Sequence, residues 1–306
     1  MTEPNFLLIG PPKCATSSLH GAICNHAGVA QGVRKELFFL MDRGHPLAGR
    51  PNLQDDGMAS FGAAFPDAAN DAAIRIDSTT HYLYQQAALD FARRRPDVRA
   101  CVVLRDPAER VFSSYNYTRN NLAALKSELS FAQYVELVDA RQPLYPRYCH
   151  SASSAWVLER DIDYSRYERH VAPWLDALGP ERLKIVLFED LQRNTSAVAQ
   201  DIWAWLGLEP PPGPAVAAER RNETRAVKYR QFHRLVRKLN AAVPLPSGLK
   251  KHLKSGYHTL QGGAPDASDD QPAVDRLRDR FGADIDWVSK TLGRDLSHWL
   301  GKGNVR

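Results

Sequence analysis

Lys13 and three hydroxyl residues, Thr16, Ser17 and Ser18, stand just behind the apolar run at 6–9. The run is typical of a buried strand, and one glycine and two prolines separate it from the expected start of a helix. The first turn of a helix presents amide groups without intrahelical partners, and the helix dipole adds positive potential there. Because an ammonium group and several hydroxyls stand beside it, this turn is suited to binding phosphate.

Two other interpretations of this turn have to be weighed. A nucleotide triphosphatase loop requires four residues between two glycines and then Gly-Lys-Ser/Thr, whose hydroxyl binds magnesium. Here Lys13 precedes the hydroxyls and is separated from them by Cys14 and Ala15, so that order is absent. An ordinary N-capped helix would also carry these residue types. The turn alone leaves the choice open.

A second polar turn follows the apolar run at 100–104. Arg105 comes immediately after this run, and Pro107 fits the first turn of a following helix. Ser113 lies further along the same predicted helix. Arg105 and Ser113 are therefore expected to contact one phosphate.

At this point the residues resemble a family. Residues 13–18 resemble the 5′-phosphosulfate loop of sulfotransferases that use 3′-phosphoadenosine 5′-phosphosulfate (PAPS), and residues 104–115 are similar to the 3′-phosphate segment of that family. The stretches 184–191 and 202–208 follow its later pattern, in the bacterial and heparan-sulfotransferase-like branch. The resemblance implies that PAPS is the sulfate donor and PAP the product, with Lys13 acting on the leaving phosphate. The donor-binding residues that it implies are Lys13, Cys14, Ala15, Thr16, Ser17, Ser18, Arg105 and Ser113.

One departure from the family concerns Ala15, which stands where glycine is usual. A methyl group is tolerated there if the backbone φ is negative. Ala15 therefore bears on the affinity for the donor rather than on the identity of the family.

Glu36 is the first candidate for the base that takes the acceptor's proton. In heparan-type and bacterial members a glutamate just before an aromatic pair has this role, and Glu36 precedes Phe38 and Phe39. A plain surface Lys-Glu pair is the alternative. His81 is the second candidate, because an unperturbed imidazole titrates near neutral pH. The catalytic lysine of heparan-type members aligns with Ser78.

A basic segment near residue 220 supplies further candidates for the donor site. The family has a basic loop after its last long helix that closes over the nucleotide. By this resemblance Arg221, Arg225 and Lys228 are expected to contact the 3′-phosphate.

The whole sequence predicts an α/β fold. Its 306 residues are 43% hydrophobic, and apolar runs alternate with helical stretches, which is typical of a mostly parallel sheet flanked by helices. By the resemblance this is the sulfotransferase fold, which is like that of P-loop nucleotide kinases. We expect a single domain over 1–306, an acceptor-side helical insert near 116–148 and a mobile loop near 256–272.

Composition limits the partners. The net charge of +5 favours acidic ligands in general, but the Lys/Arg clusters read as solvated faces, and no nucleic-acid partner is predicted. The four cysteines have no paired metal-ligand spacing, so they are expected to be reduced and no metal is expected. Without an apolar segment of membrane-spanning length or a signal sequence, a cytoplasmic protein is expected.

The sequence thus predicts a sulfotransferase that moves the sulfuryl group of PAPS in line to an acceptor hydroxyl, without a metal. The acceptor is left open among carbohydrates, lipids and small molecules, and the oligomeric state is left open too. Two alternatives are a P-loop nucleotide or small-molecule kinase and a catalytically weak PAP-binding module.

Overall fold

The computed structural model describes residues 3–49, 51–58, 61, 64–65, 72–209 and 270–300. These residues fall into two compact units. The first contains the described residues up to Arg110, those from Tyr164 to 209 and those from Phe281 to 300, and the second contains Val111 to Asp163 and residues 270–280. The sheet and most of the predicted site residues lie in the first unit.

The first unit is built on a five-stranded parallel sheet with the order β2-β3-β1-β4-β5. The predicted α/β fold is confirmed, and four of the five strands match the apolar runs in the sequence. The edge strand β2 was not predicted, because it has three residues and its last, Gln31, is exposed. The strands are β1 (Phe6–Gly10), β2 (Val29–Gln31), β3 (Ile74–Asp77), β4 (Arg99–Leu104) and β5 (Leu183–Leu187).

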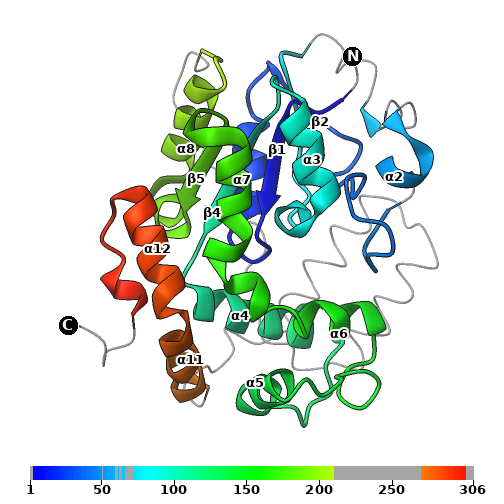
Figure 1. Cartoon of the computed structure of the whole chain (residues 1–306), viewed down its shortest axis with the longest axis vertical. Helices are drawn as coiled ribbons and strands as arrows, with labels where there is room; N and C mark the ends of the chain where they lie inside the picture. The colour runs from blue at the N-terminus through cyan, green and yellow to red at the C-terminus, as the bar shows by residue number, and fades with distance from the viewer. Residues whose placement is uncertain are drawn as a thin grey trace, which may run out of the picture. The chain divides into compact units, whose positions relative to one another are not determined.

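Helices cover both faces of this sheet. Helix α1 (Thr16–Ile23) packs with α8 (Phe188–Trp205), whereas α7 (Tyr167–Arg182) packs with α3 (Gln86–Arg94) and α12 (Gly282–Leu292). In Figure 1, α7 and α3 pass in front of the strands. The remaining described elements of this unit are α2 (Leu53–Asp56), η3 (Tyr82–Tyr84), η5 (Asp163–Ser165, whose first residue belongs to the second unit) and η7 (Ser297–Trp299).

The core of the first unit lies on both sides of β1, whose five residues are all buried. Phe6 and Leu8 pack into a cluster with Leu19 of α1 and with Ile202 and Trp203 of α8. Successive side chains of a strand point to opposite faces, so Leu7 and Ile9 are buried on the other side. A strand buried on both faces reads as a continuous apolar run, which is why β1 was evident in the sequence.

The second unit is helical. It takes in the end of α4 (Pro107–Asn116), η4 (Tyr117–Asn121), α5 (Phe131–Asp139), α6 (Ala152–Leu158) and α11 (Gln271–Arg278), and η6 (Asp279–Phe281) follows α11. Tyr115, Phe131 and Tyr134 form its aromatic centre, with ring centroids 5.3 to 5.8 Å apart. Arg280 donates two hydrogen bonds of 2.7 Å to the carboxylate of Asp139, which fastens the end of η6 to α5.

Some domain-level predictions lie beyond these observations. The roles expected for 116–148 and for the whole chain as one domain stay predictions, and most of 256–272 lies outside the described residues. In the described part of the chain no helix is long and apolar enough to cross a membrane.

Candidate functional site

Three predicted site segments meet at one edge of the sheet. The strands are all parallel, so β1, β3 and β4 end at the same edge, and the segments starting at Pro11, Ser78 and Arg105 begin there. This is the edge at which open α/β sheets bind their ligands. The three turns are therefore neighbours.

The loop from β1 to α1 has an unusual backbone. Lys13 and Ala15 have φ values of 72° and 59°, and Ala15 is the residue just before the helix. Its carbonyl accepts hydrogen bonds from the N–H groups of Ser18 at 3.0 Å and Leu19 at 3.1 Å. No side chain caps the first turn of α1. The amide groups of this turn are therefore available to an anion, and Lys13 brings a positive charge to the loop.

The backbone of Ala15 does not meet the condition under which a methyl group is tolerated. Its φ is 59°, in the left-handed region where Cβ is disfavoured. The tight change of direction between β1 and α1 requires this conformation, which suits a glycine.

A first prediction follows from this strain. Replacing Ala15 with glycine should raise the free energy of unfolding by about 1 kcal/mol, because it removes the left-handed cost of a Cβ. Ala15→Val should lower it, since a β-branched residue fits this region worse. Urea denaturation of the three proteins measures both effects. A less stable glycine variant would contradict the assignment of strain.

Gly10 brings the β1 end against the segment after β3. Its φ is 115°, and a Cβ built on it would lie 2.0 Å from the carbonyl oxygen of Thr80. A residue with a side chain would collide with this backbone. The glycine therefore allows Thr80 to lie directly beside the loop that carries Lys13.

Arg105 joins the same loop from β4. Its Nη1 donates to the carbonyl oxygen of Lys13 at 3.4 Å, and Nη2 lies 3.4 Å from the carboxylate of Glu109. The guanidinium is 4.6 Å from the ring centroid of Phe188, and the hydroxyl of Tyr167 donates to the Arg105 carbonyl at 2.7 Å. Arg105 is thus held at the loop with its side chain partly exposed, in a position to meet an anion.

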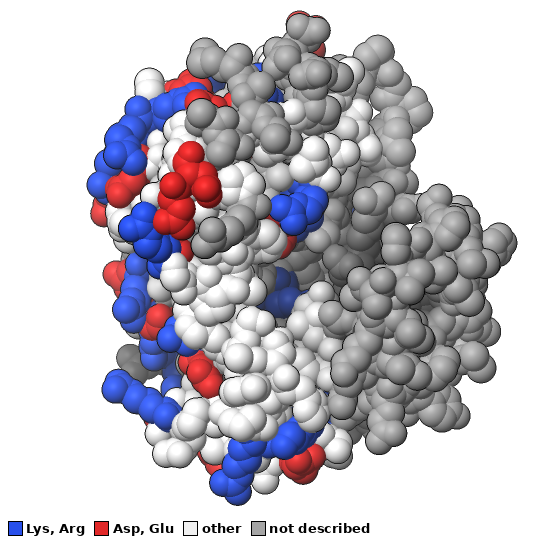
Figure 2. Space-filling model, turned by 90° about the vertical axis from the view of Figure 1, so that its right-hand side faces the viewer, with Lys and Arg blue, Asp and Glu red and all other residues white. Residues whose placement is uncertain are grey.

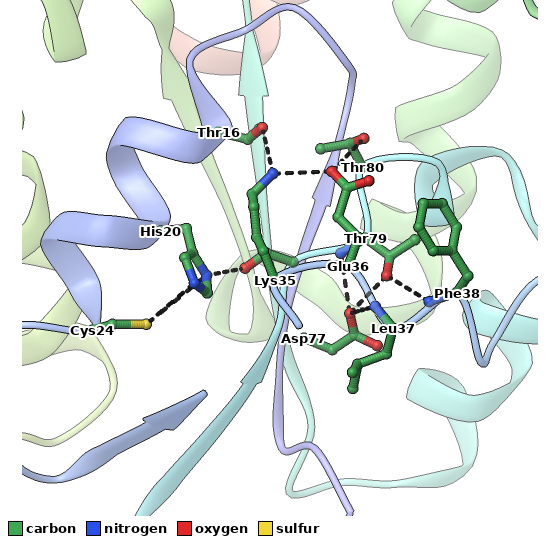
Figure 3. Close-up of polar contacts among 11 residues, drawn as sticks. Thr16, His20, Cys24, Lys35, Glu36, Leu37, Phe38, Asp77, Thr79 and Thr80 are labelled. Atoms are coloured by element: carbon green, nitrogen blue, oxygen red, sulfur yellow. Dashed lines mark hydrogen bonds and ion pairs between the residues drawn. The ribbon is translucent and has the colours of Figure 1, made fainter. Parts of the chain in front are cut away.

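Glu36 lies beside this loop as well, and Figure 3 shows its contacts. Its Oε1 is 3.0 Å from Nζ of Lys35 and accepts a hydrogen bond of 3.2 Å from the hydroxyl of Thr80. The same Lys35 Nζ is 3.4 Å from the hydroxyl of Thr16, the first residue of α1. The Lys-Glu pair is therefore half-buried and linked to the donor loop, unlike a plain surface pair.

Asp77 fixes the segment that carries Glu36. Its Oδ1 accepts from the Leu37 amide at 3.4 Å and from the amide and hydroxyl of Thr79 at 3.1 and 2.7 Å. Its Oδ2 accepts a hydrogen bond of 2.7 Å from the hydroxyl of Tyr82. The hydroxyl oxygen of Tyr82 in turn accepts a hydrogen bond of 3.1 Å from the Leu40 amide. These contacts hold in place the chain that follows Glu36.

Burial raises the pKa of Asp77 to about 6, although the hydroxyls of Tyr82 and Thr79 favour its charged form. A carboxyl whose folded pKa exceeds the unfolded one stabilises the fold fully at low pH and loses this contribution as pH rises. We expect the unfolding free energy of Asp77→Asn to rise by about 2 kcal/mol relative to that of the wild type between pH 4 and pH 7. Urea denaturation across this range measures the difference between the two proteins. A difference that does not change with pH would contradict the buried titration.

Ser78 contacts His20 of α1. Its side chain is fully buried, with Oγ 2.7 Å from Nδ1 of His20. The other ring nitrogen of His20 is 3.2 Å from Oε1 of Gln31 and 3.7 Å from the sulfur of Cys24. The position that the resemblance aligns with a catalytic lysine is thus part of a buried polar group beneath α1.

His81 is buried beside aromatic rings. The ring centroids of His45, Tyr84 and Tyr164 are 5.9, 6.2 and 6.3 Å from that of His81. Burial lowers the pKa of His81 to about 3, with contributions from His45 and Arg110, so the imidazole is neutral throughout the physiological range. Its Nδ1 is buried and has no hydrogen-bond partner among the described residues.

Cys14 has a structural place in the loop. Its side chain is fully buried, and desolvation raises the pKa of the thiol to about 12. A thiol with so high a pKa is not a nucleophile at neutral pH. All four cysteines are free. Within the described residues, no group of three or more His, Cys, Asp or Glu side chains is placed to hold a metal ion.

Four other predicted residues are not joined to this site. Ser113 lies on α4 in the second unit, so its shared contact with Arg105 stays a prediction. Arg221, Arg225 and Lys228 lie outside the described residues. The hydroxyls of Ser17 and Ser18 are half-buried in the first turn of α1.

Sequence reasoning missed Lys35 and Asp77 as site residues. Lys35 was weighed only as a surface partner of Glu36, and Asp77 was given no role at the site. A signal existed for Asp77, because an acidic residue closing a buried strand needs hydrogen-bond donors. The contact of Lys35 with Thr16 crosses 19 positions of sequence and had no local signal.

The surface adds little to the choice of partner. On the face shown in Figure 2, Lys and Arg side chains are interspersed with Asp and Glu, and uncharged residues cover much of the described area. A nucleic-acid site is marked instead by basic residues clustered on one face. The described part of this face lacks such a cluster.

Comparison with known proteins places this arrangement in a family. Residues 3–235 match the model of the sulfotransferase domain. The chain is 21% identical over 206 residues to bifunctional heparan sulfate N-deacetylase/N-sulfotransferase 1 of Caenorhabditis briggsae, covering 67% of this chain and 23% of that protein. It is 24% identical over 216 residues to the human N-deacetylase/N-sulfotransferase 2, covering 68% and 22%. The chain thus spans less than a quarter of the length of these relatives.

A solved structure supports the fold. The crystal structure of a sulfotransferase from Alicyclobacillus acidocaldarius superposes with a TM-score of 0.62 at 19% identity, covering 98% of this chain and 99% of that one. At this level of identity the likeness concerns the fold, with its parallel sheet and flanking helices.

Proposed function

Because the chain belongs to the sulfotransferase domain family, we propose that it transfers the sulfuryl group of PAPS to a hydroxyl of an acceptor. The observation that carries the proposal is the position of Glu36. Its carboxylate contacts Lys35, and Lys35 in turn contacts Thr16 at the start of α1, the helix that would bind the donor. A base and an anion site at one sheet edge are the two parts that in-line transfer requires.

The donor would bind at the loop from β1 to α1. The uncapped first turn of α1 and the ammonium of Lys13 suit its 5′-phosphate, and Arg105 suits a second anionic group. Binding of the 3′-phosphate by Arg105 and Ser113 is part of this proposal. Such a 3′-phosphate site would make the protein bind PAPS in preference to ATP, which has only a hydroxyl at its 3′ position.

In the transfer, the acceptor oxygen attacks sulfur while the bond between sulfur and the phosphate oxygen breaks. Glu36 takes the acceptor's proton, and Lys13 stabilises the negative charge that develops on the leaving phosphate. Thr80 donates to one oxygen of Glu36 and so orients the carboxylate. No step in this scheme requires a metal ion.

Glu36 is a better base than His81 on physical grounds. Burial disfavours the imidazolium of His81 and lowers its pKa to about 3, so that this imidazole is a poor proton acceptor at neutral pH. Glu36 is partly exposed and can reach an acceptor. We assign His81 to the wall of the acceptor side, near Tyr84 and Tyr164.

The test combines binding and transfer. Calorimetry should show that the protein binds PAP, and incubation with PAPS and a panel of carbohydrates, lipids and phenols should give a product heavier by one sulfate in mass spectrometry. Transfer should survive chelation of metals. Transfer of phosphate from ATP that depends on magnesium would overturn the proposal in favour of a kinase. Binding of PAP without transfer to any acceptor would favour a binding module.

The cellular location also remains a proposal. We propose that the protein acts in the cytoplasm, because its four cysteines are free and the cytoplasm keeps thiols reduced. Fractionation of cells that produce the protein tests this assignment.

A further inference from the structure

Lys35 stands between the two halves of the proposed site. Its ammonium lies 3.0 Å from Oε1 of Glu36 and 3.4 Å from the hydroxyl of Thr16 at the start of α1. Figure 3 shows the side chain reaching up between these two groups. One cation therefore touches both the proposed base and the helix turn that would bind the donor.

The backbone around Lys35 is fixed. Its carbonyl accepts a hydrogen bond of 3.0 Å from the amide of Ser78, and the amide of Leu37 donates to Asp77. The side chain of Lys35 is 23% exposed, so its charge is only partly screened by water. Its position next to Thr16 is thus built into the segment that follows β2.

We propose that Lys35 is a catalytic residue that changes partner when the donor binds. In the free protein its ammonium pairs with Glu36. The 5′-phosphosulfate at the first turn of α1 then attracts Lys35, which leaves Glu36 with Thr80 and free to take a proton. This inference rests on the proposed function, because it requires a phosphosulfate at that turn.

The chemistry balances without a proton from Lys35. The acceptor proton goes to Glu36, the new bond joins the acceptor oxygen to sulfur, and the electron pair of the broken bond stays on the phosphate oxygen. Lys35 contributes charge to the transferring group and keeps its three protons. Because Nζ is already 3.4 Å from the Thr16 hydroxyl, a rotation of the side chain is sufficient for the exchange.

This exchange predicts a coupling between Lys35 and Glu36 in donor binding. In the wild type, Glu36 competes with the donor for the ammonium. Glu36→Gln removes the competing charge, so the variant should bind PAP more tightly. The gain depends on Lys35, and it should vanish in a variant that lacks the ammonium.

A double-mutant cycle read by calorimetry with PAP tests the coupling. We expect Lys35→Met to weaken PAP binding about tenfold, as for the loss of one charge-assisted contact. Glu36→Gln should tighten it about threefold, the scale of a partly exposed ion pair. Lys35→Met/Glu36→Gln should bind PAP as Lys35→Met does. Lys290→Met, which removes an exposed lysine of α12, is the matched control and should bind as the wild type does.

Each outcome decides a different point. Wild-type protein that does not bind PAP would overturn the proposed function and this inference with it. Normal wild-type binding would leave the proposed function standing, and an equal effect of Glu36→Gln in both backgrounds would then overturn the exchange alone. Lys35→Arg keeps the charge and should stay within about threefold of the wild type. An arginine variant as weak as Lys35→Met would show that charge is not the reason.

Discussion

Lys13→Ala is expected to lower kcat by about a hundredfold to a thousandfold, the scale seen when one group that stabilises developing charge is removed. Lys13 has a φ of 72°, and alanine carries the same left-handed cost, so the backbone is unchanged in energy and the effect reports on the ammonium. Steady-state rates of sulfate transfer from PAPS measure the loss.

Two further variants make this result specific. Lys13→Met keeps the length of the side chain and should be as slow as the alanine variant, because only the charge is missing. Lys184→Met, at β5, removes a lysine that pairs with Asp201 at 2.8 Å and should keep its turnover. Undiminished turnover in Lys13→Ala would remove Lys13 from the donor site.

The strand ends were predictable because the central strands are buried on both faces. Strands β1 and β4 appear in sequence as nearly continuous apolar runs, and the residues directly after them, Pro11 to Lys13 and Arg105, mark the binding edge of a parallel sheet. The order β2-β3-β1-β4-β5 was not predicted, since it depends on which strands pair across long stretches of chain.

The candidate site was predictable at the residues whose own charge and place next to an apolar run indicate a role. Lys13, Glu36 and Arg105 each follow an apolar run or precede one, and their charge marks them in the sequence. Lys35 and Asp77 gain their roles from partners far along the chain. Asp77 contacts Leu37 across 40 positions, and nothing local in the sequence indicates that pairing.

The backbone at Ala15 shows a different limit. Composition can indicate a turn, but the sign of φ depends on how α1 is joined to β1 and on the close approach of Thr80 to Gly10. The sequence carried alanine, which favours negative φ, and the fold imposes the opposite. Tertiary structure here overrides a local preference.

Glu36→Gln is expected to lower kcat by about a hundredfold to ten-thousandfold, the usual contribution of a general base. The glutamine keeps an oxygen that can accept from Thr80 and has nearly the shape of glutamate, so the segment held by Asp77 should stay in place. PAP binding should tighten about threefold in the same variant. Rates of sulfate transfer and calorimetry with PAP separate the two effects.

The comparison with His81 decides which residue takes the proton. His81→Asn should fold, and its rate of sulfate transfer should fall less than that of Glu36→Gln. The reason is that the neutral, buried imidazole only lines the acceptor side in the proposed mechanism. Glu181→Gln, an exposed change near the end of α7, should leave the rate unaltered. If His81→Asn instead lost turnover and Glu36→Gln kept it, the proton would pass to His81, and the pairing of Lys35 with Glu36 would have no part in the chemistry.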